Sequence, residues 1–469
     1  MRSTRSFSRS RLIVAGAIAL VYALAVPAAG HAAAPNCLLP AGQKAAPTQS
    51  PLRFGIYPGG PVGSVNPKAP PRRENPAKRL AALKALAGSN PFVARLYSGW
   101  TGDPVDNTWL GREIAGYTAA GIHIELVVRY KPSAPNAAGS PAAFADHVRA
   151  IVRRYGPNPG FDSLQVTNEA NLPDAPGAAD GAFAGAAEAV VQGVIAAKDE
   201  ARKAGHDKLR VGFSWAYDER PQASSEFWGA LGRIGGGAFA DAVDWVGLDS
   251  YPGTWTPQLA LTNLLPAQAA AAMKESVRAL RDCFMPLAGL GKATSLHIAE
   301  NGFPTGPGRS EALQAQVLEA MVKGVDAIRS TYGVTDYRWF DLRDSSTADP
   351  SLESQYGITR DDYSPKPAFT SYQNLIVQYG GGGGAVAKAR NCRPSRVKIT
   401  VPRGKRRGRV KSLVVRVGNK TLARMRSSQV KRAVRISLRS GRRVVRLKLT
   451  TQHDGRRHTS VKRRTYRIC

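Results

Sequence analysis

Short apolar runs recur about every 30 to 45 residues between Pro51 and Tyr379. The eight runs read RFGIYPG, FVARLYSG, HIELVVRY, SLQVTNEA, LRVGFSWAY, DWVGLDSY, SLHIAENG and YRWFDLRD. Their apolar positions are continuous rather than alternating, which is typical of parallel strands that are covered on both faces. The pattern therefore predicts eight buried parallel strands.

Most of the gaps between these runs contain apolar residues at helical spacing, as in NPAKRLAALKALAG, FADHVRAIVRRYG and EALQAQVLEAMVKGVDAIRSTYG. Eight strand and helix units in about 330 residues predict an α/β fold of the (β/α)8 TIM barrel class. An open doubly wound sheet is the alternative. However, RFGIYPGGPVGS lacks the GxGxxG spacing of a dinucleotide-binding open sheet.

The end of the chain has a different pattern. VKITVPRG, SLVVRVGNKTLARM and AVRISLRSGRRVVRLKLTT alternate apolar with polar or basic residues, and Gly-Asn and Ser-Gly turn signals separate them. From Arg393 to Cys469 there are 27 Lys and Arg and one acid, Asp454, so this segment carries +26 of the formal net charge of +32. We expect a small basic all-β module, and its charge favours an anionic partner such as a cell-wall polymer.

The beginning of the chain resembles an export signal. MRSTRSFSRSR carries four arginines and no acid, and an apolar run and the small-residue stretch HAAAP follow it. This order predicts a secretory signal peptide that is cleaved near Ala32 or Ala34, with an uncleaved anchor as the alternative. No later segment approaches the roughly 20 apolar residues that span a bilayer. We therefore expect a secreted, extracellular protein without a transmembrane segment after signal cleavage.

These patterns divide the chain into five segments. A run of five glycines, Gly380 to Gly384, predicts a flexible linker before the basic module. The predicted segments are a signal peptide (1–34), an N-terminal linker (35–50), a (β/α)8 catalytic domain (51–379), a Gly-rich linker (380–391) and a basic β module (392–469).

The four cysteines are Cys37, Cys283, Cys392 and Cys469. An even number in an exported chain permits disulfides, and three full pairings are possible. Cys392 and Cys469 bracket the basic module and are the preferred pair. The sequence has no CxxC and no HExxH, so it predicts no metal site.

Two of the apolar runs lead to a glutamate. Glu169 follows the fourth run, in LQVTNEAN, and Glu300 ends the seventh, in LHIAENGFPTG. Active sites of (β/α)8 barrels lie at the carboxyl ends of the strands, so these two carboxylates are expected to face each other across the barrel mouth. Hydrolysis of a glycosidic bond uses such a pair, because one carboxyl group protonates the leaving oxygen while the other attacks or stabilises the anomeric carbon.

Asn168, Glu169 and Glu300 resemble the catalytic residues of clan A of the glycoside hydrolases. These are retaining (β/α)8 enzymes that include cellulases, β-mannanases, β-1,3-glucanases and endo-β-1,4-galactanases. The resemblance covers roughly residues 51 to 380. It implies that Glu169 is the acid/base, that Glu300 is the nucleophile, and that Asn168 donates a hydrogen bond to the sugar 2-hydroxyl.

Three further residues match positions of this clan. Arg95, in VARLYSG, resembles the arginine that keeps the nucleophile ionised. Tyr251, in GLDSYPGTW, resembles the tyrosine that hydrogen-bonds the nucleophile, and Trp339, in YRWFDL, resembles the aromatic residue under the sugar. From the residues alone, Arg95 could also be a structural ion-pair partner, Asn168 a turn former, and the two aromatic residues core packing.

Other residues near strand ends remain open. Trp100, Trp215 and Trp255 are further candidates for a sugar-stacking surface. Tyr130 and Asp249 have no secure counterparts in the His-containing signatures of many cellulases, so the substrate sugar stays open.

The leading hypothesis is a secreted retaining glycosidase that acts on a β-linked polysaccharide or oligosaccharide without a metal or organic cofactor. The alternative is a non-catalytic carbohydrate-binding or wall-binding protein on the same barrel. A specific nucleic-acid partner is less favoured, because the basic segment has a single aromatic residue, Tyr466, for base stacking.

Overall fold

The computed structural model describes most of the barrel region and the strands of the C-terminal region. The described residues are 50–59, 66–102, 108–133, 139–260, 264, 266–291, 293–381, 392–393, 396–400, 409–417, 420–430, 433–437 and 441–468. The predicted signal peptide, residues 35–49 of the predicted N-terminal linker and residues 382–391 of the Gly-rich linker lie outside them. The chain divides into two compact units, Met1–Gly380 and Gly381–Cys469.

Eight parallel strands close into a barrel in the first unit, which confirms the predicted fold class. Each strand pairs with the next along the chain, and β1 pairs in parallel with β8 to complete the ring. The strands are β1 (Arg53–Ile56), β2 (Phe92–Trp100), β3 (His123–Tyr130), β4 (Phe161–Val166), β5 (Arg210–Ala216), β6 (Trp245–Asp249), β7 (Ser295–Glu300) and β8 (Val334–Trp339).

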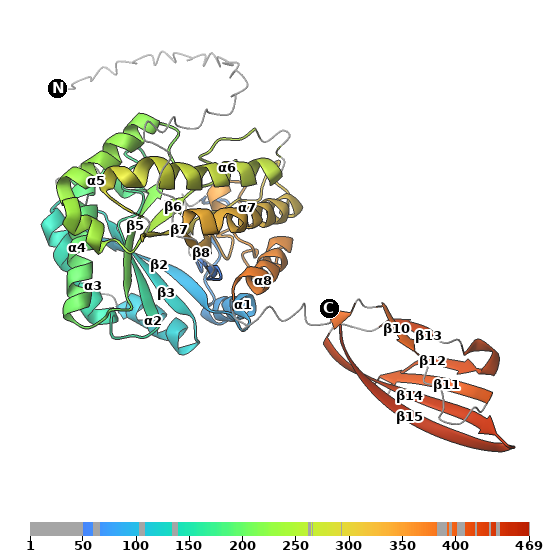
Figure 1. The fold of residues 1–469 in the computed structure, drawn as a ribbon. Helices are drawn as coiled ribbons and strands as arrows, with labels where there is room; N and C mark the ends of the chain where they lie inside the picture. Colours follow the sequence, from blue (N-terminus) through green and yellow to red (C-terminus); the bar gives the residue numbers. More distant parts are fainter. Residues whose placement is uncertain are drawn as a thin grey trace, which may run out of the picture. The chain divides into compact units, whose positions relative to one another are not determined.

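A helix follows each strand, and the helices surround the barrel (Figure 1). Two of their starts show why the sequence begins a helix there: Ser140 accepts a hydrogen bond from the amide of Ala143, and Ser310 accepts one from the amide of Leu313. The main helices are α1 (Pro76–Ala87), α2 (Thr108–Ala119), α3 (Pro141–Tyr155), α4 (Ala186–Lys203), α5 (Pro221–Ala242), α6 (Pro266–Ala279), α7 (Glu311–Tyr332) and α8 (Pro367–Tyr379). Among the described residues, no helix combines the length and the apolar character needed to cross a bilayer.

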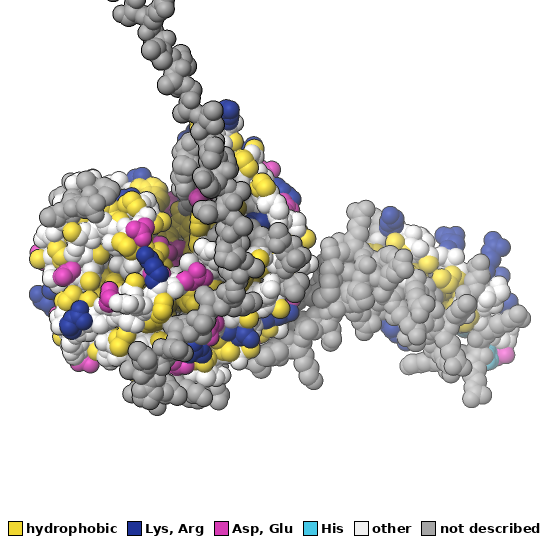
Figure 2. Space-filling model, turned by 90° about the horizontal axis from the view of Figure 1, so that it is seen from above, with side chains coloured by type: hydrophobic (Ala, Val, Ile, Leu, Met, Phe, Trp, Pro, Cys, Tyr) yellow, Lys and Arg dark blue, Asp and Glu magenta, His cyan; other side chains and the backbone are white. Residues whose placement is uncertain are grey.

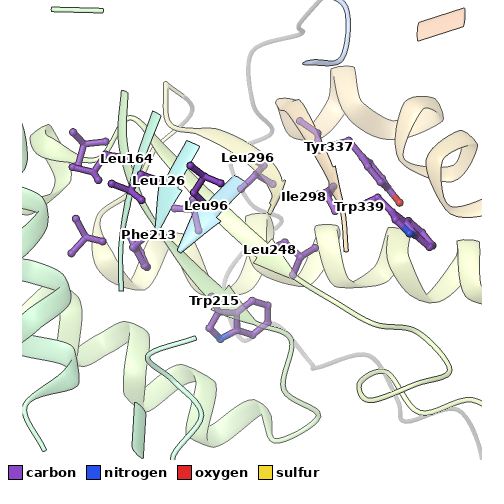
Figure 3. Close-up of a cluster of buried hydrophobic side chains, with 14 of the residues drawn as sticks. Leu96, Leu126, Leu164, Phe213, Trp215, Leu248, Leu296, Ile298, Tyr337 and Trp339 are labelled. Atoms are coloured by element: carbon purple, nitrogen blue, oxygen red, sulfur yellow. The ribbon is translucent and has the colours of Figure 1, made fainter. Parts of the chain in front are cut away.

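The core lies between the strands and these helices. Figure 3 shows part of it, where Leu96, Leu126 and Leu164 of neighbouring strands lie near one another. All three are buried, and they belong to one continuous hydrophobic cluster. Such a packed framework holds the strand ends in fixed positions, which a site built from several strands requires.

A network of buried charges fills part of the barrel interior. Glu125 on β3 accepts hydrogen bonds from Arg95 at 3.0 Å and from Arg338 at 3.1 Å, and Arg338 also donates to Asp336 at 2.6 Å. Nδ1 of His297 lies 3.4 Å from Glu125. Burial alone would raise the pKa of Glu125, but Arg338 and His297 hold it well below its usual range.

The second unit is all-β, as the sequence predicts. A five-stranded sheet has the order β12-β11-β14-β15-β9, and β10 pairs with β13 in a separate two-stranded sheet. One face of the larger sheet contributes to a small hydrophobic cluster that also contains Ile436 of β13. The strands are β9 (Cys392–Arg393), β10 (Arg396–Thr400), β11 (Arg409–Val417), β12 (Lys420–Arg426), β13 (Ala433–Ser437), β14 (Gly441–His453) and β15 (Arg456–Ile468).

Cys283 is disulfide-bonded and lies buried after α6. The side chains of Cys37, Cys392 and Cys469 lie outside the described part of the chain. The pairing of Cys392 with Cys469 therefore stays a prediction.

Candidate active site

Three carboxylates meet at the carboxyl ends of the barrel strands. Glu169 follows β4, Asp249 ends β6 and Glu300 ends β7. One carboxylate oxygen of each lies within 4.8 Å of the other two, and all three side chains are buried. The topology thus brings the two glutamates of the sequence prediction together, and it adds an aspartate whose role the sequence left open.

The backbone after β4 explains how Glu169 reaches this cluster. Thr167 and Glu169 adopt positive φ angles of 65° and 48°, which residues with side chains rarely do. The hydroxyl oxygen of Ser214 on β5 accepts the amide hydrogen of Glu169 at 3.2 Å. Strained conformations of this kind persist where the surrounding structure enforces them, and they concentrate at functional sites.

Asn168 lies between these two residues and is buried. Its backbone amide donates to Asp180 at 2.8 Å, and its side-chain amide donates to the carbonyl of Ala178 at 3.0 Å. Asp180 also accepts from Arg129 at 2.8 Å. Burial raises the pKa of Asp180 to about 6 against the opposing effect of Arg129. Asn168 therefore helps to hold the loop, and the bond to Ala178 uses one of the two hydrogens of Nδ2.

Glu300 accepts three hydrogen bonds from side chains. Tyr251 donates to Oε2 at 2.7 Å, while Arg95 at 3.2 Å and Tyr97 at 2.5 Å donate to Oε1. The predicted contacts of Arg95 and Tyr251 with Glu300 are present. Sequence reasoning missed Tyr97, although it lies two residues after Arg95 on the same strand and therefore on the same face.

The site surrounds Glu169 and Asp249 very differently from Glu300. Burial, and then the negative charges of Glu300 and Asp249, raise the pKa of Glu169 well above its ordinary value. Burial and Glu300 also raise the pKa of Asp249, against the opposing effects of Arg95 and Ser214. Within the described structure, neither oxygen of Asp249 has a hydrogen-bond partner at bonding distance.

An aromatic group lies beside Tyr251. Phe340 stacks on Tyr57 with ring centroids 5.1 Å apart, and it meets the rings of Tyr251 and Tyr356 edge to face. Phe340 is partly exposed.

Trp339 does not occupy the position that the sequence led us to expect. Its side chain is fully buried in the core at the end of β8 (Figure 3), so no face of the ring is open to a sugar. Phe340 is the residue that reaches the group beside Tyr251, because successive side chains of a strand point to opposite sides. The expected position is therefore wrong by one residue. Of the other candidates, Trp100 and Trp215 are buried, whereas Trp255 is 47% exposed.

Among the described residues, two groups have metal-compatible spacing. Glu125, His297 and Asp336 form one, and the three site carboxylates form the other. In the first group, Arg338 donates to one oxygen of Glu125 and one oxygen of Asp336, so a cationic side chain already contacts two of the three members. In the group of the three site carboxylates, the guanidinium group of Arg95 lies 3.2 Å from an oxygen of Glu300, so a cationic side chain also contacts this group.

No family model matches the chain, and no curated protein matches it. Among solved structures, it is similar to a family 39 glycoside hydrolase from the gut symbiont Bacteroides cellulosilyticus WH2, with 14% identity, a TM-score of 0.44, and coverage of 88% of this chain and 70% of that one. It is also similar to a GH5_18 from Bifidobacterium longum subsp. longum ATCC 55813, with 15% identity, a TM-score of 0.48, and coverage of 71% and 80%.

A third similar structure is the β-glucuronidase of Bacteroides uniformis, with 12% identity and a TM-score of 0.44. The alignment covers 90% of this chain but 46% of that enzyme, so the chain spans less than half of its length. The solved structures named here are thus glycoside hydrolases. At these identities, the function has to be argued from the geometry of the site itself.

Proposed function

We propose that the chain is a retaining glycoside hydrolase that acts on a β-linked polysaccharide or oligosaccharide. The observation that supports this most strongly is the pairing of Glu169 and Glu300. Carboxyl groups of retaining enzymes lie about 5 to 5.5 Å apart, and inverting enzymes separate them by about 6.5 to 9.5 Å. The closest oxygens of these two glutamates lie within 4.8 Å, and this supports the shorter spacing of a retaining pair.

The surroundings of each glutamate suit one role. Arg95, Tyr97 and Tyr251 donate hydrogen bonds to both oxygens of Glu300 and hold its carboxyl group in place, as a nucleophile requires. The pKa of Glu169 is raised, so Glu169 holds a proton at a pH where an ordinary glutamate has lost it. This is the state of a general acid.

The reaction then proceeds in two displacements. An oxygen of Glu300 attacks the anomeric carbon while the glycosidic C–O bond breaks, and Glu169 gives its proton to the leaving oxygen. Glu169, now ionised, takes a proton from a water molecule whose oxygen attacks the same carbon and releases Glu300. Two inversions restore the original anomeric configuration.

A pair of variants tests this assignment. Glu300→Gln should abolish turnover of an aryl β-glycoside. Glu319→Gln, which removes a half-exposed carboxylate on α7 that pairs with Lys323, should leave it unchanged. NMR of the first product of the wild type should show the retained anomer. An inverted product would refute retention. Wild-type turnover by a folded Glu300→Gln variant would remove Glu300 from the mechanism. A wild-type protein that binds glycans but cleaves no glycoside would favour the alternative of a non-catalytic carbohydrate-binding protein.

We also propose that the enzyme is secreted and attaches to anionic cell-wall polymers through the basic module. The leader-like beginning of the chain supports export. The charge of the C-terminal segment supports attachment, since it carries +26 with one acid. Cell fractionation of the full-length protein, with and without its first 34 residues, tests export directly.

A further inference from the structure

Three arginines lie side by side across the five-stranded sheet of the C-terminal unit. Arg416 on β11 is in register with Arg446 on β14, and Arg446 is in register with Arg463 on β15. Registered residues of neighbouring strands point to the same face, and the strands lie about 4.8 Å apart. All three side chains are exposed. We refer to Arg416, Arg446 and Arg463 as the arginine row.

The arginine row lies on the face opposite the hydrophobic cluster of the module. Val415 and Leu447 are next to row residues along β11 and β14, and both belong to that cluster. Side chains alternate between faces along a strand, so the row points away from the cluster. The next rung on the same face adds Arg424 and Lys448, both exposed. Figure 2 shows Lys and Arg in dark blue along the described surface of the module.

The three positive charges of the arginine row repel one another, and none of the described residues of the C-terminal unit places an acid beside them. Like charges directly opposite each other in a sheet destabilise it. The one acid of the segment, Asp454, lies in the turn between β14 and β15, where it contacts His453. The contact found for Arg416 is uncharged, since Nε donates to the hydroxyl of Thr421 at 3.1 Å. A bound chain of anions would turn this repulsion into attraction.

We propose that the arginine row is the binding surface for an acidic polysaccharide, a linear chain of sugars that carry carboxylates. This inference rests on the proposed attachment role of the module and goes beyond it by naming the surface and the chemistry of the partner. The planar guanidinium group of arginine matches a carboxylate with two parallel hydrogen bonds. A row of cations at the spacing of neighbouring strands engages successive charged groups of one extended chain.

The apolar residues of this face favour a polysaccharide over a nucleic acid. Val444 and Val461 share the face with the row and are 42% and 57% exposed, so they offer apolar contact to the C–H surfaces of sugar rings. Single-stranded nucleic acids are bound largely by stacking of bases on aromatic rings. The described residues of this face include no aromatic side chain.

The test compares two double variants of the full-length protein that lose the same charge. Arg446→Gln/Arg463→Gln interrupts the row, whereas Arg456→Gln/Arg457→Gln removes two exposed cations from the start of β15. Binding to immobilised polygalacturonate is measured at several salt concentrations. The row variant should bind about 10-fold or more weakly, and its dependence on salt should fall by about two charges. The β15-start variant should stay within about threefold of the wild type.

Other outcomes would overturn the proposal in distinguishable ways. Equal losses in the two double variants would show that net charge, and not the row, binds the partner. Tighter binding to single-stranded DNA, polyphosphate or anionic phospholipid vesicles than to polygalacturonate would show that the partner is not an acidic polysaccharide. Failure of the wild type to bind any of these polyanions would refute the attachment role itself, and hydrolysis of soluble glycosides would still report separately on the barrel. Removing like charges should not lower the Tm, so loss of binding by a folded row variant can be attributed to the row.

Discussion

Replacing Asp249 by asparagine should change the pH dependence of the proposed catalysis. An oxygen of Asp249 lies within 4.8 Å of an oxygen of Glu169. At that distance, and with an effective dielectric constant of about 20, two negative charges repel by about 3.5 kcal/mol. The repulsion acts in full only when Asp249 is ionised, and burial together with Glu300 raises the pKa of Asp249 as well. We therefore expect Asp249→Asn to lower the pKa of Glu169.

The direction of the effect follows from the role of Glu169 as an acid. Activity requires its proton, so kcat/KM falls as the pH rises through its pKa. A lower pKa moves this falling limb to lower pH. The measurement is a pH profile of kcat/KM with an aryl β-glycoside, and the control is Asp174→Asn, which removes a carboxylate that is 80% exposed. A limb that stays in place, or moves to higher pH, would refute the idea that Glu169 feels the charge of Asp249.

The same variant should also change stability. The pKa of Asp249 is raised in the folded protein, so the unfolded chain loses this proton first as the pH rises. The folded state is therefore penalised above the unfolded pKa, and the penalty disappears at lower pH. Asp249→Asn should raise the Tm at pH 7 more than at pH 4. A variant that is less stable than the wild type at pH 7 would contradict this reasoning.

Three further predictions concern other parts of the chain. Lys366→Met leaves the buried carboxylate of Asp344 without its contact to Nζ at 2.7 Å, so the free energy of unfolding measured with urea should fall by about 3 to 5 kcal/mol. Adding Asp344→Asn to this variant should restore part of that free energy, and a fall of less than about 1 kcal/mol would contradict the prediction. Cys392 and Cys469 should be joined by a disulfide in non-reducing peptide maps, and two free thiols would exclude this pairing. A disulfide that closes a loop of about 77 residues should add about 4 kcal/mol to the free energy of unfolding. Removing residues 385–469 should leave hydrolysis of a soluble glycoside unchanged but abolish retention on anionic wall material. Retention of the full-length protein that survives 1 M salt would exclude an electrostatic mechanism.

The sequence predicted the barrel because its eight apolar runs are regular and helical patterns separate most of them. It also placed Glu169 and Glu300 at strand ends, and the parallel topology then brings them together. Trp339 shows the limit of this approach. At the end of β8, a shift of one residue separates a side chain buried in the core from one at the mouth of the barrel. Periodicity alone does not locate the end of a strand to within one residue.

The contacts inside the barrel could not be predicted from the sequence. Tyr97 donates to Glu300 because β2 and β7 lie across the barrel from each other, which is a property of closure and not of either segment. Asp249 looks like an ordinary strand-end acid in DWVGLDSY, and its distinctive feature is its distance from two other carboxylates. Such distances depend on the register of several strands at once.

The charges inside the barrel limit how this protein can evolve. Arg338 reaches Glu125 and Asp336 past Gly55, where a Cβ atom would lie 2.6 Å from the Arg338 side chain. A leucine of a core can change to a similar residue on its own, but the loss of one ion leaves its partner buried and uncompensated. Related sequences should therefore change these positions together or not at all. Selection for a new substrate would therefore change the loops that follow the strands more readily than this network of buried charges.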